Sequence, residues 1–280
     1  GIQSDSLNIA LDQNEIVNTM TGLAGTGLLG ASSAANANTI RDGETGVALD
    51  AAADGAIVRY NTIHDMGIGI ASAGDLLNSI YGNEIYSNGI GIEGGARIGG
   101  DDWAEPNVIY DNAIVGIRAG QDSEIRYNRI LNNTIGIEAA PHNHIHHNVI
   151  ARSTDHAVFV EMGIDVEIGF NTIYSPNGNG VTLIDNTAGT SLHHNIIWTQ
   201  NGYAVSVDLT SQSGFESDHN NLFRSGSGEL VQWQKSYSDL YNWQVETGFD
   251  QHSIGWTAPH PNRDNPNFID VAADNFRLMD

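Results

Sequence analysis

The chain has 280 residues, with 34 Asp or Glu against 11 Lys or Arg, which gives a formal net charge of −23 at pH 7. Nucleic acids and anionic membranes bind through clustered basic side chains, so this composition argues against both as partners. The sequence has no cysteine, which excludes disulfides and thiolate chemistry, and it has no apolar run of membrane-spanning length.

A short cassette, Asn followed two places later by an aliphatic residue, recurs along most of the chain. Its asparagines are separated by 20 to 26 residues and are Asn14, Asn38, Asn61, Asn83, Asn107, Asn128, Asn148, Asn171, Asn195 and Asn221. The residues two places later are Ile16, Ile40, Ile63, Ile85, Ile109, Ile130, Ile150, Ile173, Ile197 and, in the last cassette, Phe223. A period of this length is typical of solenoids, in which each unit buries its apolar face only against its neighbours.

Apolar residues alternate within each unit, which favours short strands over helices. Ile125, Ile145, Ile168 and Leu192 lie three places before an Asn, and the alternation breaks at the Asn itself. We expect the Asn to adopt the left-handed conformation of a sharp corner. We also expect its side chain to hydrogen-bond to the equivalent Asn of the next coil.

These patterns predict an all-β fold, a right-handed parallel β-helix of about ten coils over residues 1–230. Residues 231–280 contain three of the five tryptophans, Trp233, Trp243 and Trp256, and are predicted to form a C-terminal capping segment continuous with the coils. No comparable cap precedes residue 7, so we expect the chain to be part of a longer protein.

The units also resemble, over roughly residues 7–230, the repeats of the pectate-lyase-like superfamily of parallel β-helices, as in the stretch IRYNRILNNTIGIEA at residues 125–139. The resemblance implies the fold and, as one option, a polysaccharide lyase, although epimerases, adhesins and scaffolds share this coil. The epimerase motif Asp-Pro-His is replaced by Ala140-Pro141-His142, and the only lysine, Lys235, lies in the predicted cap. Epimerases of that type and lyases with a lysine base are therefore disfavoured.

Two columns of polar side chains, two and four places before the Asn, are expected to point outward, because the residue three places before it is a buried aliphatic. They place six candidate catalytic residues on one patch, with Gly169 forming a dent between two histidines about 10 Å apart: Glu124, Arg126, His144, His146, Glu167 and His193. In a lyase, Arg126 would neutralise the uronate carboxylate, and His146 or His193 would abstract the C5 proton. The alternative is a solvated ladder of charges with no catalytic role.

The run from His142 to His147 offers a second kind of site. His142, His144 and His146 lie on one face of an expected strand, where three imidazoles can bind Zn²⁺ or another transition metal. The alternative is a plain polar strand edge.

Candidate substrate contacts come from two further outward columns. Glu93, Arg118 and Glu138 form an acid–base–acid stripe, in which Arg118 either meets an anionic substrate or joins a salt-bridge ladder. Three places after the Asn, an aromatic strip contains His64, Tyr86, Tyr110, Tyr174 and Trp198. Aromatic faces stack on sugar rings, and they equally pack beneath long loops.

A calcium site is a further hypothesis. Asp101, Asp102 and Glu105 lie in the longest irregular insertion, residues 97–106, where carboxylate oxygens on a loop can hold Ca²⁺. The sequence contains neither an EF-hand loop nor the calcium-binding nonapeptide.

Together these features predict an extracellular or cell-surface protein that acts on an acidic polysaccharide, lyase-like if it is an enzyme. The acidic, lysine-poor composition suits a saline or cation-rich extracellular setting. The alternative is a non-catalytic solenoid module of a larger surface protein, used for adhesion, spacing or carbohydrate binding.

Overall fold

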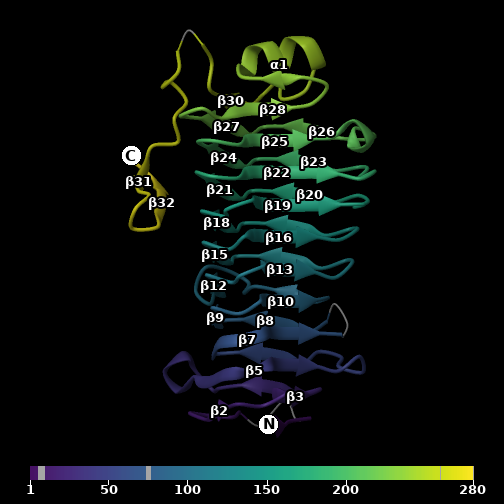
Figure 1. The fold of residues 1–280 in the computed structure, drawn as a ribbon, viewed down its shortest axis with the longest axis vertical. Coiled ribbons are helices and arrows are strands. Elements are labelled where there is room, and N and C mark those ends of the chain that lie inside the picture. The colour runs from purple at the N-terminus through teal and green to yellow at the C-terminus, as the bar shows by residue number, and fades with distance from the viewer. Residues whose placement is uncertain (6–9, 74–76, 259, 280) are drawn as a thin grey trace.

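The computed structural model describes residues 1–5, 10–73, 77–258 and 260–279, so residues 7–9 of the expected repeat and Asp280 lie outside the described part. The chain winds into a parallel β-solenoid of about ten turns with only 5% helix, which confirms the predicted fold class. In Figure 1 the coils stack from the N-terminus to a short helix at the opposite end, and the C-terminal segment runs back along one side.

A typical coil contributes one strand to each of three parallel sheets, named here sheets 1, 2 and 3. Sheet 1 precedes the Asn corner and contains β4 (Leu28–Gly30), β6 (Ile57–Arg59), β8 (Ser79–Tyr81), β11 (Arg97–Ile98), β14 (Glu124–Arg126), β17 (His144–His146), β20 (Glu167–Gly169), β23 (Ser191–His193) and β26 (Glu216–Asp218). Sheet 2 follows the corner and contains β2 (Glu15–Val17), β5 (Asn38–Leu49), β7 (Asn61–Ser72), β9 (Glu84–Tyr86), β12 (Val108–Tyr110), β15 (Arg129–Leu131), β18 (Val149–Ala151), β21 (Thr172–Ser175), β24 (Ile196–Thr199), β27 (Asn221–Arg224) and β30 (Ile254–Gly255).

Sheet 3 completes the coil and shares the long strands β5 and β7 with sheet 2. It contains β1 (Ile2–Gln3), β3 (Thr21–Gly25), β10 (Ile90–Gly94), β13 (Val115–Ala119), β16 (Ile135–Ala139), β19 (His156–Glu161), β22 (Asn179–Ile184), β25 (Tyr203–Val207), β28 (Glu229–Gln232) and the antiparallel β29 (Ser236–Tyr237). The remaining elements are the 3₁₀ turns η1 (Ala34–Asn36) and η2 (Leu209–Ser211), the helix α1 (Leu240–Thr247), and the hairpin of β31 (Phe268–Asp270) and β32 (Asn275–Leu278).

The interior is filled by aliphatic side chains stacked in register. In sheet 1 Ile125 pairs with Ile145, which pairs with Ile168, and in sheet 2 Ile130 pairs with Ile150. All five side chains are completely buried. Each such burial stabilises the fold by about 2–3 kcal/mol, so the predicted alternation is confirmed as the source of the core.

The cassette asparagines turn inward and form a continuous amide ladder. From Asn14 to Asn195, Nδ2 of each donates to Oδ1 of an Asn in the next coil, as from Asn128 to Asn148 and from Asn148 to Asn171, both at 3.0 Å. Asn148 also donates to the carbonyls of Ile125 and His146. The predicted hydrogen bonding between coils is therefore confirmed.

The left-handed corner residue is the one before the Asn. Backbone φ is 51° at Tyr127, 56° at His147, 58° at Phe170 and 55° at His194, and none of the ladder asparagines in the described chain has a positive φ. The prediction that the Asn itself takes this conformation is wrong. The Asn side chain has to point inward to reach its copies, so the preceding residue turns the chain and carries its own side chain outward.

The register differs from the sequence prediction at two places. In the last coil the ladder passes from Asn195 to Asn220 instead of Asn221, and Leu222 rather than Phe223 pairs with Ile197. This one-residue shift places Asp218 beside His193.

The second difference lies in the insertion before Asn107. At the end of β11, Ile98 pairs with Ile80 of β8. The next residue, Gly99, therefore takes the sheet 1 position that Tyr81 occupies one coil earlier. Residues 100–106 leave the coil. Glu105 lies two places before Asn107, a spacing that predicts an outward position on sheet 1 like that of Arg126 before Asn128, but the insertion removes it from that column.

Residues 231–279 occupy two different places. The first part covers the last coil, where Trp243 is 1% exposed and packs against the core. The second part is the β31–β32 hairpin, whose Phe268 and Phe276 pack against Leu131 and Tyr174 on the outside of sheet 2. Figure 1 shows this hairpin beside the strands of sheet 2, far from α1. The division of the chain at residue 230 stays a prediction.

Candidate functional site

The six residues of the predicted catalytic patch are brought onto one face of sheet 1. Glu124 pairs with His144 and Arg126 with His146 across β14 and β17, and the next strand places Glu167 beside His144. His193 follows one coil later, beside Gly169. The expected adjacency of these residues is confirmed; their catalytic role stays a prediction.

Within the patch the charges neutralise one another. Glu124 accepts from Arg126 at 3.0 Å, from Arg97 at 3.3 Å and from His146 Nε2 at 3.2 Å. Burial opposes the ionisation of Glu124, but Arg126, His146 and Arg97 outweigh it and hold the pKa of this carboxyl below its usual value. Its oxygens are therefore occupied by neighbours.

The second carboxylate of the patch is similarly engaged. Glu167 interacts with His193 Nε2 at 3.0 Å and with His144 Nδ1 at 3.3 Å. The dent expected at Gly169 is filled, because a Cβ on Gly169 would lie only 2.4 Å from the ring of His193. No space is left there for a sugar.

Arg126 is not free to receive a substrate carboxylate. It is bound by Glu124 and Asp101, and its side chain is 15% exposed. Its Nε is buried without a hydrogen-bond partner. The geometry gives Arg126 a structural role in joining β14 to the insertion.

A ladder of stacked rings runs along the corner between sheets 1 and 2, and the sequence analysis did not find it. Its rings belong to the residue before each Asn and are stacked 4.7–5.1 Å apart between centroids: Tyr127, His147, Phe170, His194 and His219, followed by His252. The signal was available, since an aromatic or His precedes Asn in successive cassettes.

Pairs of histidines connect this ladder to the patch. His146 and His147 face each other through Nδ1 at 2.9 Å, and His193 and His194 do so at 3.2 Å. In each such contact one ring nitrogen donates and the other accepts, so the two rings of a pair are held together. Burial and the adjacent His146 lower the pKa of His147.

The acid–base–acid stripe on sheet 3 forms a salt-bridge ladder. Arg118 contacts Glu138 at 2.9 Å and Glu93 at 3.1 Å, and all three side chains are about one-third exposed. Because Arg118 lies between the two carboxylates, its guanidinium is already occupied.

The aromatic strip does not present open ring faces. The ring of Tyr86 is stacked between His64 and Tyr110, with centroids 4.8 and 4.9 Å apart, so only ring edges face solvent. Tyr174 is buried and Trp198 partly buried beneath the β31–β32 hairpin. Packing, the second reading of the strip, describes these residues better than sugar stacking.

The acidic insertion does not gather its carboxylates. Asp101 pairs with Arg126 and Arg97, Asp102 accepts from the amide of Ala104 at 2.7 Å, and Glu105 accepts from the hydroxyl of Tyr60. Each of the three predicted calcium ligands thus has its own partner. Calcium binding by the protein stays a prediction.

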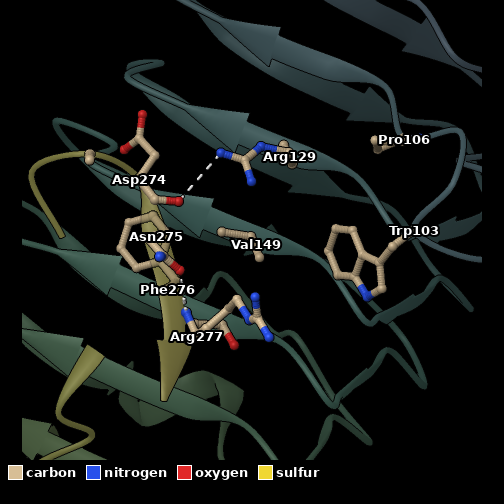
Figure 2. Close-up of a pocket in the computed structure, with 10 residues that line it drawn as sticks. Trp103, Pro106, Arg129, Val149, Asp274, Asn275, Phe276 and Arg277 are labelled. Atoms are coloured by element: carbon tan, nitrogen blue, oxygen red, sulfur yellow. Dashed lines mark hydrogen bonds between the residues drawn. The ribbon is translucent and has the colours of Figure 1, made fainter. Parts of the chain in front are cut away.

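A groove of about 740 Å³ opens on the outside of sheet 2, between the insertion and the C-terminal hairpin. Its floor is Arg129, Val149 and Thr172, its first wall Trp103 and Pro106, and its second wall residues 273–277. Figure 2 shows Trp103 facing the Asn275–Arg277 segment across Arg129 and Val149.

Two arginines in this groove have no carboxylate partner among the described residues. Arg129 donates to the backbone carbonyl of Asp274 at 3.4 Å, and the carboxylate of Asp274 pairs instead with Arg152. Arg277 is exposed on β32. Trp103, 46% exposed, meets Tyr127 edge-on, so much of its indole faces the groove.

Sequence reasoning missed these groove residues. Trp103 lies in an insertion and Arg277 in the C-terminal segment, so neither occupies a fixed offset from a cassette Asn. The sequence gives one indication of the groove: the segment with Trp103 interrupts the repeat, and the segment with Arg277 follows it.

Comparisons with known proteins identify the coil. The sequence matches the family described as the right handed beta helix region over residues 2–163 and again over residues 45–197. No curated protein and no solved structure matches the chain. No helix in the described ranges has the length and apolarity needed to cross a membrane.

Proposed function

The chain belongs to the right-handed β-helix family, and we propose that it is an extracellular protein that binds acidic polysaccharide in the groove on sheet 2. The observation that carries this proposal is the pair of arginines, Arg129 and Arg277, that line one groove without a carboxylate partner among the described residues. Arg59 and Arg224 also have no carboxylate partner in the described part of the chain, but neither of them lines this groove.

The groove offers the two contacts that a uronate unit needs. Guanidinium groups bind carboxylates through charge-assisted hydrogen bonds, and Arg129 and Arg277 lie on the floor and one wall. An indole face packs on the apolar face of a pyranose, and Trp103 forms the opposite wall. One acidic sugar can therefore be held between them.

Binding without cleavage fits the groove better than lyase action. A lyase needs a base beside the C5 proton. Of the described residues that line the groove, only Asp274 carries a carboxylate or imidazole, and it pairs with Arg152. The histidines that could supply a base lie on sheet 1 and contact Glu124 and Glu167. This favours the non-catalytic module over the enzyme.

The test is calorimetric titration with oligogalacturonate, oligoalginate and a neutral glucan. We expect an acidic oligosaccharide to bind and the neutral glucan not to bind. Trp103→Ala and Arg277→Ala should each weaken binding by about tenfold, the value of one good polar or stacking contact.

Matched controls are Tyr241→Ala and Arg263→Ala, which remove an exposed aromatic on α1 and an exposed arginine outside the groove. Equal losses in the control and groove variants would overturn the proposed site. No binding to any acidic polymer would overturn the function, and accumulation of unsaturated uronate ends would restore the lyase hypothesis.

A further inference from the structure

A second group of side chains gathers where the last coil meets the cap. Asp218 ends β26, His219 turns the corner with φ 59°, and His252 lies in the turn after α1. Their donor atoms lie within 4.8 Å of one another, and among the described residues no other three His, Asp or Glu do so. The three side chains come from two separate segments, 34 residues apart at most.

The carboxylate of Asp218 is held in one orientation by the backbone. Its Oδ1 accepts from the amide of His219 at 2.9 Å and from the amide of His252 at 2.7 Å. Its Oδ2 faces the imidazoles, 2.6 Å from Nδ1 of His252 and 3.4 Å from Nδ1 of His219. One oxygen is thus saturated by N–H donors, and the other lies beside two ring nitrogens.

We propose that Asp218, His219 and His252 form a binding site for a divalent transition-metal ion, with Zn²⁺ as the probe. Two imidazole nitrogens and one carboxylate oxygen make a donor set that zinc accepts readily and that calcium and magnesium do not favour. The backbone amides on Oδ1 act as the outer partners that orient a ligating carboxylate.

The site requires only side-chain movement. Tetrahedral zinc places neighbouring donor atoms about 3.3 Å apart, and the rings of His219 and His252 are now nearly parallel, with centroids 5.0 Å apart. Both rings therefore have to tilt toward Oδ2. Their side chains are 51% and 69% exposed, so rotation meets little resistance.

The surroundings leave the ion reachable from solvent. A hollow of about 260 Å³ lies on the sheet 1 side, lined in part by His193, Glu216 and Asp218. A second hollow of about 400 Å³ lies on the sheet 2 side, lined in part by His219 and His252. A bound ion would join the turn after α1 to the last coil.

The histidines at 142, 144 and 146 do not converge on one carboxylate as those of the proposed site do. His142 contacts Asp122, His144 contacts Glu167 and His146 contacts Glu124. Each imidazole there has a separate carboxylate, so the three nitrogens do not share one oxygen. The metal hypothesis for this run is therefore less favoured than the site at Asp218.

The experiment is titration of the metal-free protein with Zn²⁺, followed by competition with a chromogenic chelator and by thermal unfolding. We expect one ion per chain and a higher melting temperature that the chelator reverses. His219→Ala, His252→Ala and Asp218→Asn should each weaken zinc binding by at least about tenfold. The Asn keeps an oxygen for the two amides, so this variant should retain the local fold.

The matched control is His142→Ala, which removes an exposed histidine that also contacts a carboxylate, at 3.0 Å. Its zinc affinity should equal that of the unchanged protein. The Co²⁺ form should show the visible absorption of a nitrogen- and oxygen-bound ion and lose it in His252→Ala. Zinc binding that survives His252→Ala, or that falls equally in His142→Ala, would overturn the site.

Discussion

On the coils, Arg118 lies between Glu93 and Glu138, whereas in the groove Arg129 and Arg277 have no carboxylate partner within the described chain. The contrast follows from topology. In a column of residues in register, opposite charges can pair one coil away, as Arg118 does with both carboxylates. A segment that leaves the register brings side chains together without such partners. Both candidate sites therefore combine residues of the coils with a segment outside the repeat, residues 100–106 or the chain after residue 248.

The largest effect on the stability of the coils is expected from interrupting the amide ladder. Asn148→Ala removes bonds to Asn128, Asn171 and two carbonyls, leaving buried polar groups unpaired. We expect a loss of roughly 3–5 kcal/mol in the free energy of unfolding, measured by urea denaturation. Asn242→Ala, on the exposed face of α1, is the control and should change it by less than about 0.5 kcal/mol.

The groove side is tested by loosening the C-terminal hairpin. Phe276 is 8% exposed and packs against Tyr174 and Phe268. Phe276→Ala should expose residues 260–279 to proteolysis and weaken oligouronate binding, because Arg277 loses its position. The unfolding midpoint of the coils should stay within error of the unchanged protein.

The control for that variant is Leu278→Ala, whose side chain is half exposed on the same strand. Protease resistance of Phe276→Ala equal to that of the control would show that the hairpin is held by something other than its aromatic contacts.

The stabilising contribution of the paired charges on sheet 1 is expected to depend on pH. The pKa of Glu124 is lowered in the folded chain because Arg126, His146 and Arg97 together outweigh burial. A lowered pKa means that the unfolded chain binds the proton more readily. The stabilisation is therefore present above the ordinary carboxyl pKa and is lost as pH falls through the folded value.

Glu124→Gln should accordingly be less stable than the unchanged protein at neutral pH, and the difference should disappear as pH falls through the lowered pKa of Glu124. The measurement is urea unfolding across this range. Glu216→Gln, which changes an exposed residue of the same column with no ion pair in the described part, is the control and should lose less stability at neutral pH than Glu124→Gln. A pH-independent difference for Glu124→Gln would contradict the assigned role of its neighbours.

The smallest effect is expected for the salt-bridge ladder on sheet 3. Arg118→Ala should cost no more than about 1 kcal/mol, since its side chain is about one-third exposed and water screens the pair. The cost should shrink further in high salt. A loss above about 2 kcal/mol, independent of salt, would mean that the exposed column carries more of the fold than its exposure implies.

Much of the coil could be predicted from the sequence because its physics is local and periodic. The spacing of Asn and Ile gave the fold class, the stacked core and the neighbours of Glu124 and His146. It failed by one residue at Asn220, where two adjacent asparagines fit the same spacing. It also failed at Glu105, where an insertion separates sequence distance from coil position.

The groove could not be predicted from the repeat. No period places Arg277 near Trp103, because the C-terminal segment crosses several coils before it packs on Tyr174. The spacing of residues also does not predict in which direction a side chain leans along the surface. His193 leans over Gly169 and the rings of Tyr86 and Tyr110 cover each other, and neither fact follows from spacing.

The interior amides all point the same way, so their dipoles add along the axis and leave a partial positive end toward the C-terminus. At that end Asn220 donates to Asp250, a carboxylate that is 1% exposed and also accepts from Trp243 and Ser253. Asp250 thus places acceptor oxygens at the positive end of the aligned dipoles, the position at which a helix N-terminus also favours them. Both oxygens of Asp250 accept hydrogen bonds, Oδ1 from Asn220 and Ser253 and Oδ2 from Trp243, so the series of donors ends at this residue.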